Sequence, residues 1–419
     1  MAPAQPKDRA IIFEHPAFGW FWSARIVSAL AFQMQATVVS WQVYDLTHST
    51  FQLGLVGLVP YLPVVGLALV AGHLVDRFDR RLIYGLSLFA QAIAGGVLAW
   101  GSWSHAIGLP AIYAAVALFG VGRAFQGPAG QALLPTLVPE ALVPKAIAWS
   151  IGTFQTASIV GPTLAGFLYI LGPAIPYGLA AGLALAGCGC IALIRQERAV
   201  RPKPAATADS IFSGIHFIRR HPIILGTISL DLFAVLLGGA TALLPAFARD
   251  ILKIGAAGLG WLRAGPAFGS LAMSFYLARW PLQRRMGRRM FGAVAVFGAA
   301  TIVFGLSRSF ALSMAALVVL GAADTISVVV RQSLVQLETP NEMRGRVGAV
   351  NFLFIGTSNQ LGEFESGVTA SLLGTVGATV AGGIGTLIVV LLWMRWFPAV
   401  AAFDRFQPKP PLPAEPTGA

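Results

Sequence analysis

Residues 51–73 read FQLGLVGLVPYLPVVGLALVAGH, a stretch without a single Asp, Glu, Lys or Arg. About 20 consecutive apolar residues are needed for a helix to cross the hydrocarbon core of a bilayer, so this segment predicts a transmembrane helix. The whole chain has a similar character, because 56% of its 419 residues are hydrophobic and only 11% are charged. An average soluble domain has roughly 25% charged residues. The sequence therefore predicts an all-α polytopic membrane protein.

Further apolar stretches of similar length lie on both sides of that segment. Twelve spans are expected, near 18–45, 51–73, 82–103, 108–134, 145–170, 174–194, 223–246, 258–280, 288–307, 309–334, 346–372 and 376–397. They divide the chain into a tail over 1–17, a six-helix bundle over 18–194, a linker over 195–222, a second bundle over 223–397 and a tail over 398–419.

The net charge of +12 would suggest nucleic acid in a soluble protein, but here the placement of the basic residues explains it. If the N-terminus is cytoplasmic, 22 of the 29 Lys and Arg residues lie in cytoplasmic segments, and only Arg249, Lys253 and Arg308 lie in outer loops. Such an asymmetry fixes the orientation of membrane helices. We therefore expect both termini on the cytoplasmic side of the membrane, and no nucleic-acid partner.

Two segments outside the spans have their own patterns. Residues 195–209, RQERAVRPKPAATAD, are typical of a flexible linker, and the Pro-rich end of the chain predicts disorder from residue 398 onward. Between linker and span seven, Ile211, Phe212, Ile215 and Ile218 share one face of a helix ending in Arg219 and Arg220. That pattern suits a helix lying on the inner membrane surface, although it is also explained as the start of span seven.

The two six-span halves resemble duplicated copies. A shift of 206 residues aligns Arg25 with Asp231, Gly54 with Gly260 and Pro60 with Pro266, and a shift of 201 aligns Gly120 with Gly321, Arg123 with Asp324 and Gln131 with Gln332. The matches fall in corresponding spans. Parallel six-helix repeats are an architecture of secondary transporters.

Two motifs carry a resemblance to a known family. The loop Gly72-His-Leu-Val-Asp-Arg-Phe-Asp-Arg-Arg81 resembles the G-x-L-a-D-r-x-G-r-r loop of the major facilitator superfamily, with Asp79 in place of the usual Gly. Span five partly resembles the antiporter motif of that superfamily, with Ala148, Ala157, Gly161, Pro162, Ala165 and Gly166. Segments such as SWQVYDLT, MRGRVGAVN and NQLGEFESG resemble the bacterial drug and siderophore exporters, the branch that includes the enterobactin exporter.

Both motifs also have a physical interpretation. Asp76, between two spans, is expected to cap a helix N-terminus and to pair with Arg80 or Arg81. The resemblance implies that Gly72, Asp76, Arg77, Arg80 and Arg81 form a cytoplasmic latch reaching toward Arg344 and Arg346, while the alternative is that these arginines only set topology. In span five, Gly161 and Gly166 allow close helix approach and Pro162 allows bending. Ordinary membrane-helix packing explains the same residues.

Charges inside the spans mark functional candidates, because each costs about 2.5–3.5 kcal/mol at the bilayer centre on insertion scales. The basic ones are Arg25, Arg123, Arg263 and Arg331, and the acidic ones are Asp231, Asp324, Glu363 and Glu365. Asp231 and Arg25 lie at similar depth, in spans that line the central cavity in the family, so we expect them to pair when the cytoplasmic side closes. A purely structural ion pair is the alternative. All four acids are candidates for proton coupling, with Asp231 first and Glu363 second.

Polar residues of the lining spans are candidates for substrate contact. With Arg25, Arg123 and Arg263, they are Gln33, Trp41, Gln42, Gln126, Gln155, Asn359 and Gln360. Each alone is equally explained as a hydrogen-bonding link between helices. All six histidines fall in loops or at span ends, and no metal, phosphate-loop or nucleophile motif is present in the sequence, so neither a cofactor nor an enzyme is expected.

Three functions are compatible with these patterns. A monomeric, proton-coupled exporter of small amphiphilic molecules such as siderophores or drugs, working by alternating access in contact with membrane lipid, fits best. An importer or lipid flippase of the same fold is the second, and a non-transporting membrane receptor is the third. The substrate is not predicted, because many helices together determine the shape of the cavity.

Overall fold

The computed structural model describes residues 12–195, 208–282, 284–340 and 343–404. The first part of the chain forms η1 (Ile12–Glu14), α1 (Pro16–Thr47), α2 (Thr50–Arg77), α3 (Arg80–Trp103), α4 (Leu109–Leu133), η2 (Leu134–Thr136), η3 (Glu140–Leu142), α5 (Val143–Tyr169) and α6 (Ala174–Ala192). The second part forms α7 (Ala208–Arg220), α8 (Pro222–Leu237), η4 (Ala240–Leu243), α9 (Leu244–Ala246), the π-helical turn η5 (Phe247–Ile251), α10 (Gly255–Arg279), α11 (Met286–Leu306), α12 (Phe310–Glu338), α13 (Arg344–Trp396) and α14 (Pro398–Ala402).

Helix starts follow local sequence signals. Pro16 and Pro222 lie in the first turns of α1 and α8, where a missing N–H costs nothing because that group has no partner within the helix. The Ser49 hydroxyl caps α2 by accepting a hydrogen bond from the Gln52 N–H at 3.4 Å, which satisfies one free donor of the first turn. Local Pro and Ser residues therefore determine where these helices begin, and the long apolar segments that follow form the helices themselves.

The predicted all-α polytopic membrane fold is confirmed. Eight helices of the described chain are long and apolar enough to cross a membrane, and each expected span coincides with helical structure. The single helix α13, 53 residues long, covers the last two expected spans and is interrupted at Gly374, where φ is 75°, a conformation that glycine adopts without strain. The number of twelve spans stays a prediction.

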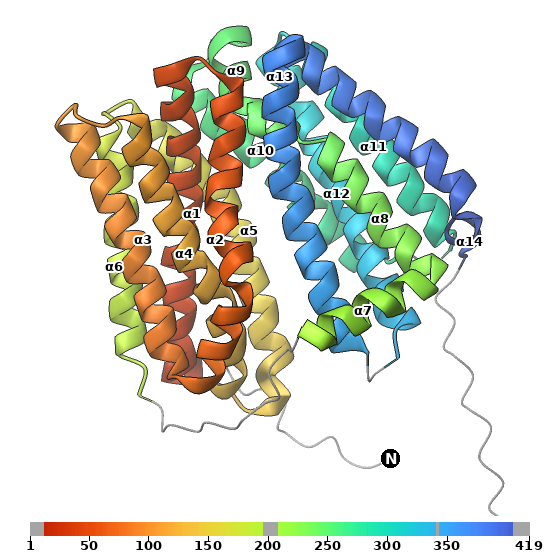
Figure 1. The fold of residues 1–419 in the computed structure, drawn as a ribbon, viewed down its shortest axis with the longest axis horizontal. Coiled ribbons are helices and arrows are strands. Elements are labelled where there is room, and N and C mark those ends of the chain that lie inside the picture. The colour runs from red at the N-terminus through yellow and green to blue at the C-terminus, as the bar shows by residue number, and fades with distance from the viewer. Residues whose placement is uncertain (1–11, 196–207, 283, 341–342, 405–419) are drawn as a thin grey trace, which may run out of the picture.

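The helices form two bundles that lie side by side (Figure 1). Helices α1 to α6 pack with one another, and α8 and α10 to α13 pack with one another. The main contacts between the bundles run from α5 to α10 and from α2 to α13. These four helices therefore carry the interface at which one bundle moves against the other in any rocking motion.

The bundles meet closely at one end of the molecule. We call it the joined end, where α1 ends at Thr47 and α10 begins at Gly255; the opposite end, with Arg77 and Arg346, is the basic end. A Cβ added at Gly54 would lie 2.9 Å from the Phe364 carbonyl oxygen, and one at Gly260 would lie 2.5 Å from that of Pro162. Figure 1 shows the ribbons of the two bundles diverging from the joined end toward the basic end.

The internal repeat predicted from sequence is matched by geometry. A Cβ added at Gly120 of α4 would overlap the carbonyl oxygen of Pro60 of α2, and one added at Gly321 of α12 would overlap that of Pro266 of α10. These are the residue pairs that the shifts of 201 and 206 align. The same glycine-on-proline contact therefore recurs in both bundles.

Two expectations about the segments outside the spans require correction. The helix predicted before span seven is α7, but Ile218 is buried among residues of α8, α12 and α13, with Ile215 packed against the same cluster. This part of its apolar face contacts protein rather than lipid. The side chains of Ile211 and Phe212, and residues 196–207 of the predicted linker, lie outside the described part of the structure.

The expectation of disorder from residue 398 was wrong for the first residues of the tail. Residues Pro398–Ala402 form α14, in which Val400 is fully buried. The Gly287 N–H donates to the Phe403 carbonyl oxygen at 3.0 Å, and the Arg285 N–H donates to the Asp404 carboxylate at 2.9 Å. The tail is ordered here because it packs on the start of α11, a tertiary contact that composition does not reveal.

Candidate functional site

The buried ion pair of the second bundle joins α8 to α12. Asp231 and Arg331 form a salt bridge, and only 7% and 3% of their respective surfaces are exposed. The predicted partner, Arg25, lies instead in the first bundle, with a guanidinium nitrogen 3.3 Å from where a Cβ of Gly130 would stand. The structure therefore supplies Asp231 with a partner inside its own bundle, and its pairing with Arg25 stays a prediction for a conformation closed at the basic end.

A second pair of opposite charges lies at the boundary between the bundles. The charges of Arg263 on α10 and Glu363 on α13 attract each other, although no salt bridge joins them among the described residues. The Arg263 guanidinium donates to the Thr37 hydroxyl of α1 at 3.4 Å. Glu363 in turn contacts α2 at Gly57, where an added Cβ would lie 2.9 Å from the Glu363 Cβ. Both charges belong to the second bundle and both reach the first.

The other two predicted acids lie in different surroundings. Glu365 accepts a hydrogen bond from the Thr369 hydroxyl of its own helix at 2.6 Å. Asp324 of α12 is half-buried, and no hydrogen bond or ion pair reaches it from the described residues. The four acids are therefore spread through the second bundle and do not converge on one point.

Several predicted cavity residues serve as links between helices. Gln42 donates to the Ser102 hydroxyl at 3.1 Å and accepts from the Tyr177 hydroxyl at 2.8 Å, which joins α1 to α3 and α6. Gln126 accepts from the Gln91 amide at 2.9 Å. Hydrogen bonds between side chains of neighbouring helices stabilise packing inside a membrane, so Gln42 and Gln126 fit the alternative of a link between helices.

Other predicted cavity residues lie where the bundles meet or face each other. The Gln155 amide of α5 donates to the Ala267 carbonyl of α10 at 3.0 Å, and Trp41 is buried beside Tyr169 and Leu243. Gln33 donates to the Ser158 hydroxyl at 2.6 Å. Of these, Gln155 and Trp41 take part in contacts between the bundles.

The remaining candidates keep local contacts in this conformation. The Arg123 guanidinium lies 4.0 Å from the centre of the Phe32 ring, a cation–π arrangement. The exposed Asn359 donates to the Ile355 carbonyl of its own helix at 2.9 Å. Gln360 is half-buried on the same helix.

The antiporter-like segment of α5 makes the close contacts that its small residues predict. A Cβ at Gly161 would lie 2.6 Å from the Gln33 Cβ of α1, and one at Gly166 would lie 2.5 Å from the Ala256 carbonyl oxygen of α10. The carbonyl of Pro162 is the group that Gly260 approaches. Helix α5 therefore packs against α1 on one side and against α10 of the second bundle on the other.

The loop between α2 and α3 is organised by Asp79 and not by Asp76, which corrects the prediction. Asp79 is the N-cap of α3, accepts from the Arg81 N–H at 2.9 Å and forms a salt bridge with the Arg81 guanidinium at 2.8 Å. Asp76 lies in the last turn of α2, and no described residue forms a hydrogen bond or ion pair with it. The residue that looked like a departure from the family pattern caps the helix, because a carboxylate accepts hydrogen bonds from free N–H groups.

The basic residues of this loop bind the ends of neighbouring helices. Arg80 donates to the Ala132 carbonyl at 3.0 Å, and Arg81 donates to the Ile194 carbonyl at 2.8 Å. Cations at helix C-termini are favoured by the helix dipole. In this conformation Arg346 donates to the Ser213 hydroxyl of α7 at 3.3 Å, so the predicted latch between this loop and the start of α13 stays a prediction for the opposite conformation.

Replacing Asp79 by Ala is expected to lower the free energy of unfolding by about 1 kcal/mol, the usual cost of losing an N-cap. The hydrogen bond from the Arg81 side chain holds the pKa of Asp79 below its ordinary value. A lowered folded-state pKa contributes stability that is present above the unfolded-state pKa of about 3.9 and is lost as pH falls through the folded-state value. Thermal unfolding of purified protein between pH 3 and pH 7 should therefore show the difference from wild type shrinking toward low pH. Asp76→Ala is the control, and an equal loss of stability in that variant would contradict the assignment of the cap.

Sequence reasoning missed the polar contacts that cross between the bundles at the joined end. The Tyr44 hydroxyl of α1 donates to the Asp250 carboxylate, and Arg249 forms a salt bridge with Asp45. The sequence predicts only that Arg249 lies in an outer loop. The pairing depends on how η5 is placed against the last turn of α1, and hydropathy does not contain that information.

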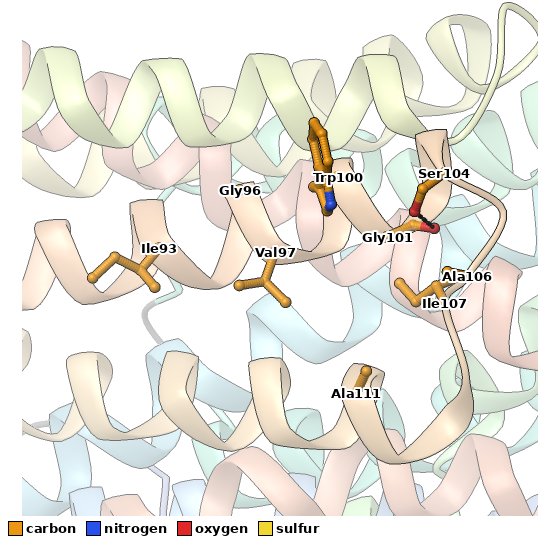
Figure 2. Close-up of a pocket in the computed structure, with 9 residues that line it drawn as sticks. All are labelled: Ile93, Gly96, Val97, Trp100, Gly101, Ser104, Ala106, Ile107 and Ala111. Atoms are coloured by element: carbon orange, nitrogen blue, oxygen red, sulfur yellow. Dashed lines mark hydrogen bonds between the residues drawn. The ribbon is translucent and has the colours of Figure 1, made fainter.

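An apolar groove of about 540 Å³ lies away from these residues, between α3 and the start of α4. Figure 2 shows Ile93, Val97 and Trp100 along its α3 wall, with Ile107 and Ala111 across from them. Val97 and Trp100 are exposed on a helix long enough to span a bilayer, which is where lipid would contact the protein. None of the predicted site residues lines this groove.

Comparison with known proteins gives one family. The family model for the Major Facilitator Superfamily matches residues 21–362. The enterobactin exporter EntS of Escherichia coli O1:K1 / APEC is 26% identical over 412 residues, covering 96% of each chain, and that of Shigella boydii serotype 18 is equally similar.

Solved structures share the fold. A bacterial homologue of the human lysosomal transporter Spinster, in an inward-facing and unoccupied conformation, has a TM-score of 0.71 at 14% identity and covers 94% of this chain and 99% of that one. A bacterial homologue of the iron transporter ferroportin, in an inward-facing state, has a TM-score of 0.68 at 19% identity and covers 93% and 99%.

Proposed function

The chain belongs to the major facilitator superfamily, and from that premise we propose that it is a secondary active exporter of small amphiphilic molecules in a bacterial inner membrane. The observation that carries this proposal is the likeness over 96% of both chains to proteins described as enterobactin exporters. The substrate class proposed by that likeness is siderophores or drugs of similar character. The relatedness at 26% identity supports the direction of transport without naming the molecule.

Alternating access is supported by the uneven contact between the bundles. They meet through Gly54, Gly166 and Gly260 at the joined end, and Figure 1 shows them apart toward the basic end. If the basic end faces the cytoplasm, as the charge asymmetry predicts, this conformation receives substrate from the cytoplasm. An exporter loads from that side.

Proton coupling is the proposed energy source. An acid enclosed by protein has a proton affinity that depends on desolvation and on the distance to the nearest cation. Any movement that brings a cation closer or admits water therefore changes proton binding. The membrane-spanning acids Asp231, Asp324, Glu363 and Glu365 are the candidates for this role.

Purified protein in liposomes is expected to accumulate enterobactin when the lumen is more acidic than the outside, because protons leaving the lumen would exchange for substrate. Dissipating the gradient with nigericin should abolish the accumulation. Glu363→Gln should reduce it at least tenfold, whereas Glu140→Gln, an exposed acid in η3 outside the spans, is the matched control. Accumulation driven only by the opposite gradient would instead support an importer, and accumulation that is indifferent to both gradients would contradict proton coupling.

A further inference from the structure

Glu363 packs against a glycine of the first bundle. Its side chain lies against Gly57 of α2, in the other bundle, so that a Cβ added at Gly57 would overlap its Oε2 atom. Its own Cβ would be 2.9 Å from that added atom, a distance at which one of the two groups must move. The seat of this carboxylate on α2 therefore requires a glycine.

The charge partner of Glu363 crosses the same boundary. Arg263 interacts with Glu363 from α10 and donates to the Thr37 hydroxyl of α1. The same two helices, α2 and α13, are also joined by a hydrogen bond of 2.5 Å between the hydroxyl groups of Tyr61 and Thr357. Glu363 therefore contacts α2 and Arg263 contacts α1, both helices of the first bundle, near the joined end.

Separation of the bundles would affect the acids differently. Asp231 keeps Arg331 and Glu365 keeps Thr369, because both partners are in the second bundle. Glu363 would lose Gly57, and Arg263 would lose Thr37. Opening of the joined end therefore changes the surroundings of Glu363 while leaving those of Asp231 intact.

We infer that Gly57 is a positioning residue for Glu363, and that the seat formed by Gly57, Thr37 and Arg263 links the charge of this acid to closure of the joined end. The inference rests on the proposed function, which needs an acid whose proton affinity follows conformation. The three residues of this seat come from three helices: Thr37 from α1, Gly57 from α2 and Arg263 from α10. Arg263 is the charged residue among them. Because such linkage is reciprocal, closure changes proton binding by Glu363 as much as its protonation changes closure.

The first test measures conformation without substrate or pH gradient. Spin labels are attached at Leu46→Cys and Lys253→Cys, exposed residues of the two bundles at the joined end, in a Cys188→Ser/Cys190→Ser background. Gly57→Ala is expected to shift the population about tenfold toward the longer distance, which corresponds to about 1.4 kcal/mol and falls within the usual cost of overpacking. Gly66→Ala, on the same helix with open space around it, is the matched control. A Gly57→Ala distribution equal to that of Gly66→Ala would overturn the inference.

The second test separates positioning of the acid from simple crowding. Adding Glu363→Asp to Gly57→Ala should restore part of the shorter-distance population, because the shorter side chain withdraws its oxygens, whereas Glu363→Gln, of equal size, should not. In the protein with native Gly57, the label distance should vary with pH, and this dependence should be lost in Glu363→Gln but kept in Glu140→Gln. The inference would be contradicted if Glu363→Asp and Glu363→Gln restored the shorter-distance population equally, or if the label distance in the protein with native Gly57 did not change with pH. Since no substrate is used, these outcomes do not depend on whether enterobactin is exported.

Discussion

Asp231→Asn is expected to destabilise the folded protein by about 3–5 kcal/mol, the usual cost of removing one partner from a buried ion pair. Arg331 is 3% exposed, and its Nε atom has no hydrogen-bond partner in the described structure. Removing the carboxylate therefore leaves a buried cation with nothing to offset its desolvation. Thermal unfolding of purified protein in detergent should show the loss as a large drop in melting temperature.

A second substitution identifies which cation the carboxylate balances. Asp231→Asn/Arg331→Gln should recover much of the stability, because both charges are then absent. Asp45→Asn is a matched control for an exposed pair and should cost about 1 kcal/mol or less, because its salt bridge with Arg249 is solvated. Recovery by Arg25→Gln in place of Arg331→Gln would contradict the pair seen here and favour the partner predicted from sequence.

The depth of a charge in a span could be predicted from sequence, but its direction could not. Hydropathy predicts that Asp231 and Arg25 lie at similar depth in the membrane. Two residues make contact only if they share a depth and also lie on facing sides of their helices. In a chain with apolar residues on nearly all faces, no polar stripe marks the facing side of a helix. Arg331 was recognised as an interior charge, yet only packing of α8 against α12 shows that it is the partner.

Irregular backbone was the least predictable part of the fold. Span seven was expected as one helix over 223–246, whereas α8 ends at Leu237 and the chain continues through η4, α9 and the π-helical turn η5. η5 brings Arg249 and Asp250 against the last turn of α1. Such a turn depends on tertiary contacts with another part of the chain, and local propensity is only a weak guide to them.

The repeat, in contrast, could be predicted because it is encoded in residue identities at fixed separations. The shift of 201 residues aligns Gly120 with Gly321, and in the structure Gly120 packs on the carbonyl group of Pro60 and Gly321 on that of Pro266. A close helix contact needs a residue without a side chain. The duplicated chain preserved both members of that contact.

Gly120→Ala and Gly321→Ala should therefore each destabilise their own bundle by about 3 kcal/mol or more, at or above the top of the usual range for overpacking. The added methyl group would meet backbone, the carbonyl of Pro60 or Pro266, and a backbone carbonyl cannot rotate away as a flexible side chain does. Folding into the membrane should fail or the melting temperature should fall sharply, as measured by size-exclusion chromatography and thermal unfolding in detergent.

The matched control lies on the same helix as Gly120. Gly127 of α4 has open space where its Cβ would stand, so Gly127→Ala keeps the change in helix propensity and removes the collision. Because Ala is favoured over Gly within a helix by about 1 kcal/mol, this variant should be as stable as the native protein or more so. If Gly120→Ala behaves like Gly127→Ala, the contact between α2 and α4 tolerates a methyl group. The glycine-on-proline contacts would then not contribute to the stability of the two bundles in the way proposed.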